Sequence, residues 1–229
     1  MEEHIVRRRA MRDEQKEARR QDILDTAWHL FQATTYDQVT MMDIARALGL
    51  AKGTVFLYFK TKEALFLALV EQQLIFWFAH VDARLSEREG TGTIEHITEL
   101  FVQTLEANPA LTRLLAILHT LLEQNIDLET ALHFKHMLLE HFKRTGALLE
   151  HCLPFLAAGQ GAHLLLQSHA LVIGLWHLSD PAPVVKQALQ QPELHMFEIH
   201  FTTEFSTALR ALFYGLERTA KGRATEENT

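Results

Sequence analysis

The chain has little of what disulfide-linked, turn-rich or membrane-spanning proteins need. Among 229 residues there is one cysteine, Cys152, so the chain cannot form an internal disulfide, and a reducing compartment is favoured. Only 10 glycines and 5 prolines are present, which favours helices over turn-rich sheets. No run of about 18 uninterrupted apolar residues occurs, because the best candidate, 164–178, contains Gln167, Ser168 and His169. We therefore expect an all-α protein with no membrane partner.

Signatures of export, catalysis and metal binding are also missing. The first 20 residues lack the apolar core of a signal peptide, which predicts a cytoplasmic location. There is no GxSxG, P-loop, Rossmann, HExxH or CxxC pattern, so neither an enzyme nor a cofactor is expected. His133, His136 and His141 fall on one predicted helix, but the five-residue step to His141 turns away from the shared face. We predict no metal site there.

Two short helices joined by a glycine turn are predicted between residues 40 and 65, TMMDIARALGLAKGTVFLYFKTKEAL. Thr40 can cap a helix that begins at Met41, and Asp43 supplies the other half of a capping box. Gly49 can take the left-handed conformation that ends this helix. A second helix follows at 52–58, and such a pair is typical of a helix-turn-helix DNA-binding unit. Four apolar residues at helical spacing are expected in its core: Ile44, Leu48, Val55 and Phe59.

The start of the second helix suits a close approach to DNA. Residues 51–54 are small or basic, so the backbone can come near the duplex. Thr61 can cap a third helix at Lys62, whose positive charge is opposed by the helix dipole. A DNA phosphate bound there would offset the unfavourable interaction between the Lys62 charge and the helix dipole. The free backbone amides at the helix start would bind the same anion.

The segment LFQATTYDQVTMMDIARALGLAKGTVFLYFKTKEALFLAL, residues 30–69, resembles the N-terminal domain of TetR-type transcriptional regulators. The resemblance runs from about 20 to 69. It implies an all-α homodimer with an N-terminal three-helix DNA-binding domain and a helical bundle that binds ligand and forms the dimer. It also implies a repressor that a small molecule releases from its operator. The residues that carry it are Leu30, Phe31, Thr40, Asp43, Ile44, Ala45, Gly49, Lys52, Gly53, Thr54, Phe59, Lys62 and Glu63.

The resemblance also implies which residues contact double-stranded DNA. Lys52 is suited to guanine acceptors and Thr54 to a thymine methyl group. The chain departs from the family at Thr35, where glycine is usual, and at Phe56, where a tyrosine hydroxyl usually reaches a phosphate. Phe56 could equally be buried or face DNA. The full set of candidate DNA contacts is Thr40, Ala51, Lys52, Gly53, Thr54, Phe56, Leu57, Tyr58 and Lys62.

Charge is distributed unevenly along the chain. The net charge is −7, yet residues 1–62 hold 11 basic and 9 acidic residues while 63–229 hold 11 and 20. Local charge governs contact with phosphates, so the basic end points to DNA. A basic arm, for which we expect partial disorder without DNA, is formed by Arg7, Arg8, Arg9, Arg12, Lys16, Arg19 and Arg20. With DNA, this arm could lie along phosphates or enter the minor groove.

Helical periodicity and breakers divide the chain into two domains. Residues 1–62 are expected to form the DNA-binding domain, and 63–229 the effector-binding and dimerisation domain, with a disordered tail from Thr219. Helices are predicted at about 14–33, 41–48, 52–58, 62–85, 94–107, from Pro109 onward, 128–151, 162–178, 184–189 and 192–216.

The effector and dimer sites are inferred from the resemblance and from residue type. Mixed apolar and polar-tipped residues are candidates for a pocket that takes a small hydrophobic or aromatic effector, although core packing would explain each equally well. These are Trp77, Phe101, His119, Asn125, Phe134, Met137, Trp176 and His177. The last two long helices imply a dimer interface, although their apolar stripe would also suit an internal core. Its candidates are Leu171, Leu175, Phe197, Phe201, Phe205 and Leu209.

A homodimer would place two recognition helices on one face of DNA and so would read a near-palindromic operator. A ligand-independent accessory DNA-binding protein is the main alternative. A helical enzyme or a metal sensor is less favoured.

Overall fold

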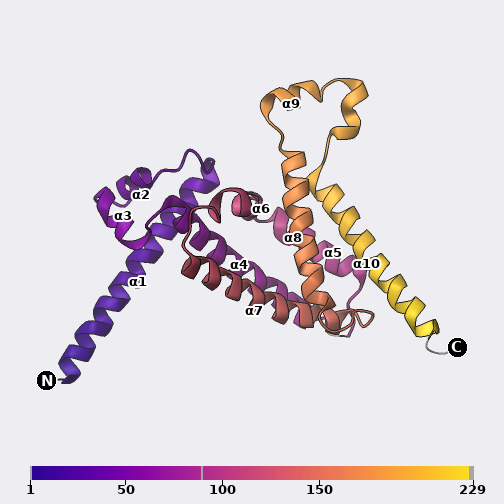
Figure 1. The fold of residues 1–229 in the computed structure, drawn as a ribbon, viewed down its shortest axis with the longest axis horizontal. Helices are drawn as coiled ribbons and strands as arrows, with labels where there is room; N and C mark the ends of the chain where they lie inside the picture. Colours follow the sequence, from indigo (N-terminus) through magenta and orange to yellow (C-terminus); the bar gives the residue numbers. More distant parts are fainter. Residues whose placement is uncertain (1, 89, 227–229) are drawn as a thin grey trace.

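The computed structural model describes residues 2–88 and 90–226, and this part of the chain contains helices and no strand (Figure 1). The all-α prediction is confirmed. In chain order the elements are α1 (Glu2–Ala33), α2 (Met41–Ala47), α3 (Lys52–Tyr58), α4 (Lys62–Ser86), α5 (Ile94–Glu106), α6 (Pro109–Ile117), the π-helix η1 (Leu118–Leu122), α7 (Leu128–Cys152), α8 (Gln160–Ser179), α9 (Pro183–Ala188), the 3-10 helix η2 (Pro192–Phe197) and α10 (Phe201–Glu226).

The helix starts follow the capping residues that the sequence offers. Thr40 and Asp43 form the predicted capping box, and Gly49 has a φ of 65° at the end of α2. The side chains of Thr61, Thr93 and Asp127 each accept a hydrogen bond from the backbone amide three residues on. Because these bonds satisfy amides that a helix leaves unpaired, they fix where α2, α4, α5 and α7 begin.

Helix α1 is longer than the sequence indicated. It begins at Glu2 rather than near Glu14, so the basic arm continues α1 as a helix instead of being a partly disordered segment. Its N-terminal half extends away from the rest of the molecule (Figure 1). The C-terminal half packs Ile23, Ala27 and Phe31 against α2 and α4, where all three are buried.

The body is a layered bundle in which α4 and α7 lie side by side and α8 crosses them, with α10 beside α8 (Figure 1). Helices α7 and α8 touch through their backbones at two glycines. A Cβ on Gly161 would lie 2.1 Å from the carbonyl oxygen of Gly146, so neither position accepts a side chain without moving a helix.

The C-terminal region differs from prediction in two places. A single helix was expected from Pro192 to Leu216, but 192–197 form η2 and residues 198–200 are non-helical before α10 starts at Phe201. The tail from Thr219 was expected to be disordered, yet α10 continues to Glu226; residues 227–229 lie outside the described part. Helix α9 and η2 form an arm that stands away from the bundle and contains no buried residue (Figure 1).

One described helix, α4, is long and apolar enough to cross a membrane by length and composition, although Gln72 and Gln73 interrupt its apolar sequence. Half of its most apolar window is buried inside the protein. Core helices pass the same test, so this is weak evidence for a membrane segment.

Candidate DNA-binding face and ligand pocket

The second helix of the motif, α3, presents its predicted residues outward. Val55 is buried and holds the helix to the domain core, while Lys52 and Gly53 are exposed and Thr54 is half-buried. Leu57 is 81% exposed and Phe56 is 39% exposed. The Lys52 ammonium lies 5.8 Å from the centre of the Phe56 ring, so the ring helps to position that charge on the surface.

Two other predicted phosphate contacts are already engaged inside the protein. The Thr40 hydroxyl donates to Asp43 at 2.5 Å and accepts from the Asp43 amide. The Lys62 ammonium donates to the carbonyl oxygen of Tyr36 and lies 3.9 Å from the centre of its ring. Burial lowers the pKa of Lys62. Lys62 therefore ties the start of α4 to the loop after α1, a role that its position in the sequence did not reveal.

Neither departure from the family pattern disturbs the motif. Thr35 has no positive φ, so glycine is not needed there, and its backbone bonds to Gln38 close the turn. Phe56 is neither fully buried nor fully exposed. Lys60, which sequence reasoning overlooked, is 87% exposed in the turn between α3 and α4.

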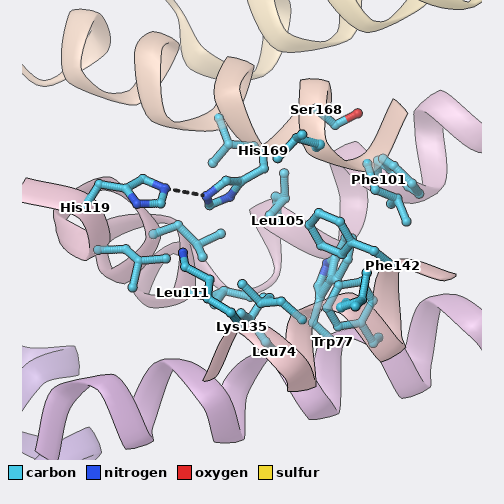
Figure 2. A pocket seen from close by; sticks show the side chains of 18 of the residues that line it. Leu74, Trp77, Phe101, Leu105, Leu111, His119, Lys135, Phe142, Ser168 and His169 are labelled. Carbon is cyan, nitrogen blue, oxygen red and sulfur yellow. Dashed lines mark hydrogen bonds between the residues drawn. The ribbon is translucent and has the colours of Figure 1, made fainter. Parts of the chain in front are cut away.

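An apolar pocket of about 270 Å³ lies in the helical bundle (Figure 2). Helices α4, α5, α6, α7, α8 and α10 and the π-helix η1 all contribute side chains. Rings gather on one side, where Trp77 lies 5.7 Å from Phe101 and 5.0 Å from Phe78, centre to centre. The lining residues are Leu74, Trp77, Phe78, Phe101, Leu105, Leu111, Leu115, Leu118, His119, Lys135, Leu138, Leu139, Phe142, Leu165, Leu166, Ser168, His169, Val172 and Phe205.

Helix register decides which predicted effector residues reach this pocket. Trp77, Phe101 and His119 line it. Helix α7 instead turns Lys135, Leu138, Leu139 and Phe142 inward, at the spacing of one helical face. The other five candidates lie elsewhere: Asn125 is exposed, Phe134 is buried outside the pocket, Met137 is half-buried, Trp176 packs on Phe201, and His177 bonds to the Ala116 carbonyl.

The polar side of the pocket is a hydrogen-bonded group of four side chains, of which the sequence predicted only His119 (Figure 2). His119 Nδ1 lies 2.8 Å from a Glu123 oxygen, and its Nε2 lies 3.3 Å from His169 Nε2. Lys135 donates to the other Glu123 oxygen at 2.6 Å. Burial and the neighbouring His119 lower the pKa of His169 to about 4, which leaves this ring neutral near pH 7. Burial opposes ionisation of Glu123, but the bonds from Lys135 and His119 outweigh it and lower the Glu123 pKa.

Models of known protein families match most of the chain. Residues 23–69 match the model of the bacterial regulatory proteins of the tetR family. Residues 71–220 match the tetracyclin repressor-like C-terminal domain, and this second match alone covers more than half of the chain. The chain belongs to the TetR family. It is therefore a TetR-family transcriptional regulator, as the resemblance of residues 20–69 implied.

Individual relatives are similar over shorter stretches or at low identity. The chain is 40% identical over 55 residues to the HTH-type transcriptional repressor Rv1474c of Mycobacterium tuberculosis, which covers 24% of this chain and 29% of that protein. Two solved structures have TM-scores of 0.44 at 17% identity: a TerR/AcrR-family regulator from Aquifex aeolicus and a protein assigned to the TetR family from Mesorhizobium loti. They cover 85% of this chain and 97% and 96% of theirs. These TM-scores are too low to support an argument.

In this TetR-family protein, Arg113 joins the pocket to the DNA-binding domain. It lies on α6 between the pocket residues Leu111 and Leu115. Its guanidinium donates to the carbonyl oxygens of Thr34 and Phe31, each at 2.8 Å. It also lies 4.6 Å from the centre of the Phe31 ring. These carbonyls end α1, so an arginine from the body caps the first helix of the motif.

The predicted dimer residues fall into two groups. Phe205 and Leu209 are buried within the single chain, where Phe205 lines the pocket. Leu171, Leu175 and Phe201 are half-buried, and Phe197 is 56% exposed on the arm.

Cys152 is buried, and its thiol donates to the carbonyl of Leu85 at 3.3 Å. Within the described residues no three histidine, cysteine or acidic side chains form a group that could hold a metal ion.

Proposed function

We propose that the protein is a cytoplasmic, ligand-responsive transcriptional repressor that binds a near-palindromic operator as a homodimer. In this proposal residues 1–62 bind DNA, while 63–229 bind the effector and form the dimer. A small apolar effector enters the pocket and releases the operator. The observation that carries the proposal is the direct connection from the pocket through α6 and Arg113 to the end of α1.

Ligand response requires that the effector favour one spacing of the two DNA-binding domains over another. An effector between α6 and α7 would press on Leu111 and Leu115, and a shift of α6 would pull on α1 through Arg113. A built pocket at this position favours a sensor over an accessory DNA-binding protein without a ligand. A compound screen tests the distinction: an effector must raise the melting temperature and also release a selected operator.

Replacing Lys52 with alanine is expected to weaken specific operator binding about tenfold or more, because a side chain that bonds a base edge contributes about 1–3 kcal/mol of discrimination. Fluorescence anisotropy of a labelled operator measures the effect, with a scrambled duplex to report non-specific binding. Lys143→Ala serves as control, because Lys143 is exposed on α7 far from the motif. An unchanged affinity in Lys52→Ala would remove this residue from the recognition set.

The dimer is expected to depend on the half-buried face of α8. Placing glutamates at both Leu171 and Leu175 should yield a folded monomer in sedimentation and abolish tight operator binding, because two half-sites must be held at once. Leu132→Glu is the matched control, since Leu132 is exposed on α7. A dimer that persists in the double variant would place the interface elsewhere.

A further inference from the structure

Among the described residues, the pocket lining contains basic side chains and no acidic side chain. Lys135 is the one lysine, arginine or carboxylate side chain among the lining residues of the described chain, and His119 and His169 bring ring nitrogens beside it. The Glu123 carboxylate bonds to His119 and Lys135 but is not part of the lining. A bound molecule therefore meets nitrogen donors and no acidic group.

The hydrogen bonds limit the roles of these nitrogens. An ionised Glu123 only accepts, so His119 Nδ1 carries a proton. In the bond between the two rings, one Nε2 donates its hydrogen and the other accepts. The positive Lys135 and the negative Glu123 form an ion pair. The neutral His169 ring can still accept a proton.

We propose that the effector is an amphipathic organic acid whose apolar body occupies the aromatic side of the pocket and whose single carboxylate binds at Lys135 and the His119–His169 pair. This inference rests on the ligand response proposed above. The ligand carboxylate accepts from the Lys135 ammonium, which has three N–H donors and uses one for Glu123. A cationic head group would be repelled by Lys135.

The location of Lys135 and His119 explains how the ligand is oriented in the pocket. Lys135 and His119 are exposed, whereas Phe101, Phe78 and Phe205 are buried at the apolar side. The acid group therefore stays near water while the apolar body is enclosed. Figure 2 shows His119 on the opposite side of the pocket from Phe101 and Phe142. A cavity of about 270 Å³ suits one short alkyl chain or a small ring system and not a bulky multi-ring compound.

Proton uptake should accompany binding. A carboxylate beside His169 favours the charged ring, so it raises the pKa of His169 from its low value in the free protein. The groups facing this ring are His119, Lys135 and Glu123; the first two oppose its protonation and Glu123 favours it. Affinity for the acid should therefore rise as the pH falls from about 8 to about 6.

The test compares three unbranched probes of ten carbon atoms each: decanoate, decan-1-ol and decylamine. Isothermal titration calorimetry is expected to show decanoate binding tightest and decylamine weakest. In Lys135→Met, decanoate should bind about tenfold more weakly, as expected for loss of a charge-assisted hydrogen bond. Decan-1-ol should be little affected. Lys143→Met controls for a general loss of positive charge on α7. In His169→Asn, the pH dependence and the proton uptake should disappear while the protein still folds.

Operator release is measured separately by anisotropy, so the two proposals can fail independently. If decan-1-ol or decylamine binds as tightly as decanoate and still releases the operator, the ligand response stands and the carboxylate assignment is overturned. If decanoate binds in a Lys135-dependent way without releasing the operator, the assignment stands and the ligand response fails. Absence of binding by all three probes would overturn the assignment.

Discussion

Alanine at Gly161 is expected to lower the free energy of unfolding by about 2 kcal/mol or more, the range for overpacking a close contact. The added Cβ would lie 2.1 Å from the Gly146 carbonyl oxygen, and backbone atoms cannot move aside as a flexible side chain can. Helices α7 and α8 must then separate. Because both helices line the pocket, effector binding should weaken together with stability.

Urea unfolding of Gly161→Ala measures this effect, and Gly146→Ala should behave alike, since its Cβ would lie 2.4 Å from the Ala162 nitrogen. Gly222→Ala is the control, because nothing lies within 4 Å of its added Cβ. There alanine should be neutral or stabilise by up to about 1 kcal/mol, its advantage over glycine in a helix. Equal effects at Gly161 and Gly222 would contradict the close contact.

Local signals in the sequence were sufficient to predict where most helices begin or end. Thr40, Gly49, Thr61, Thr93 and Asp127 act through bonds or conformations within a few residues, so their roles could be predicted without a tertiary structure. The spacing of the helix-turn-helix residues was predicted for the same reason. Gly146 and Gly161 were not recognised, because a close approach of two helices depends on their crossing and leaves no pattern in either helix.

The residues that line the pocket were also not predictable from the sequence alone, because they depend on how the helices pack. Aromatic and histidine content suggested Phe134, Trp176 and His177 as lining, but the rotation of α7 and α8 about their axes directs other residues inward. The π-helix η1 adds a residue to the turn that carries His119, which changes the register there. The start of α10 depended on tertiary packing too, since Phe201 stacks against Phe205 and packs on Trp176, while Phe197 stays exposed.

Arg113→Met is expected to separate effector binding from operator release. The variant keeps an apolar stem of similar length but donates to neither the Thr34 nor the Phe31 carbonyl. Effector affinity should stay close to that of the unmodified protein, because Arg113 does not line the pocket. The ratio of operator dissociation constants with and without effector should fall about tenfold, as the coupling free energies between two sites are about 1–3 kcal/mol.

The measurement combines calorimetry for the effector with anisotropy for the operator, using a compound that releases the unmodified protein. Arg84→Met is the control, since Arg84 lies in the last turn of α4 and pairs there with Glu87. Arg113→Lys should lose part of the response, because one ammonium cannot hold carbonyls as the planar guanidinium fork does. Undiminished release in Arg113→Met would show that the signal reaches α1 by another path, such as α4, which lines the pocket and continues the chain from α3.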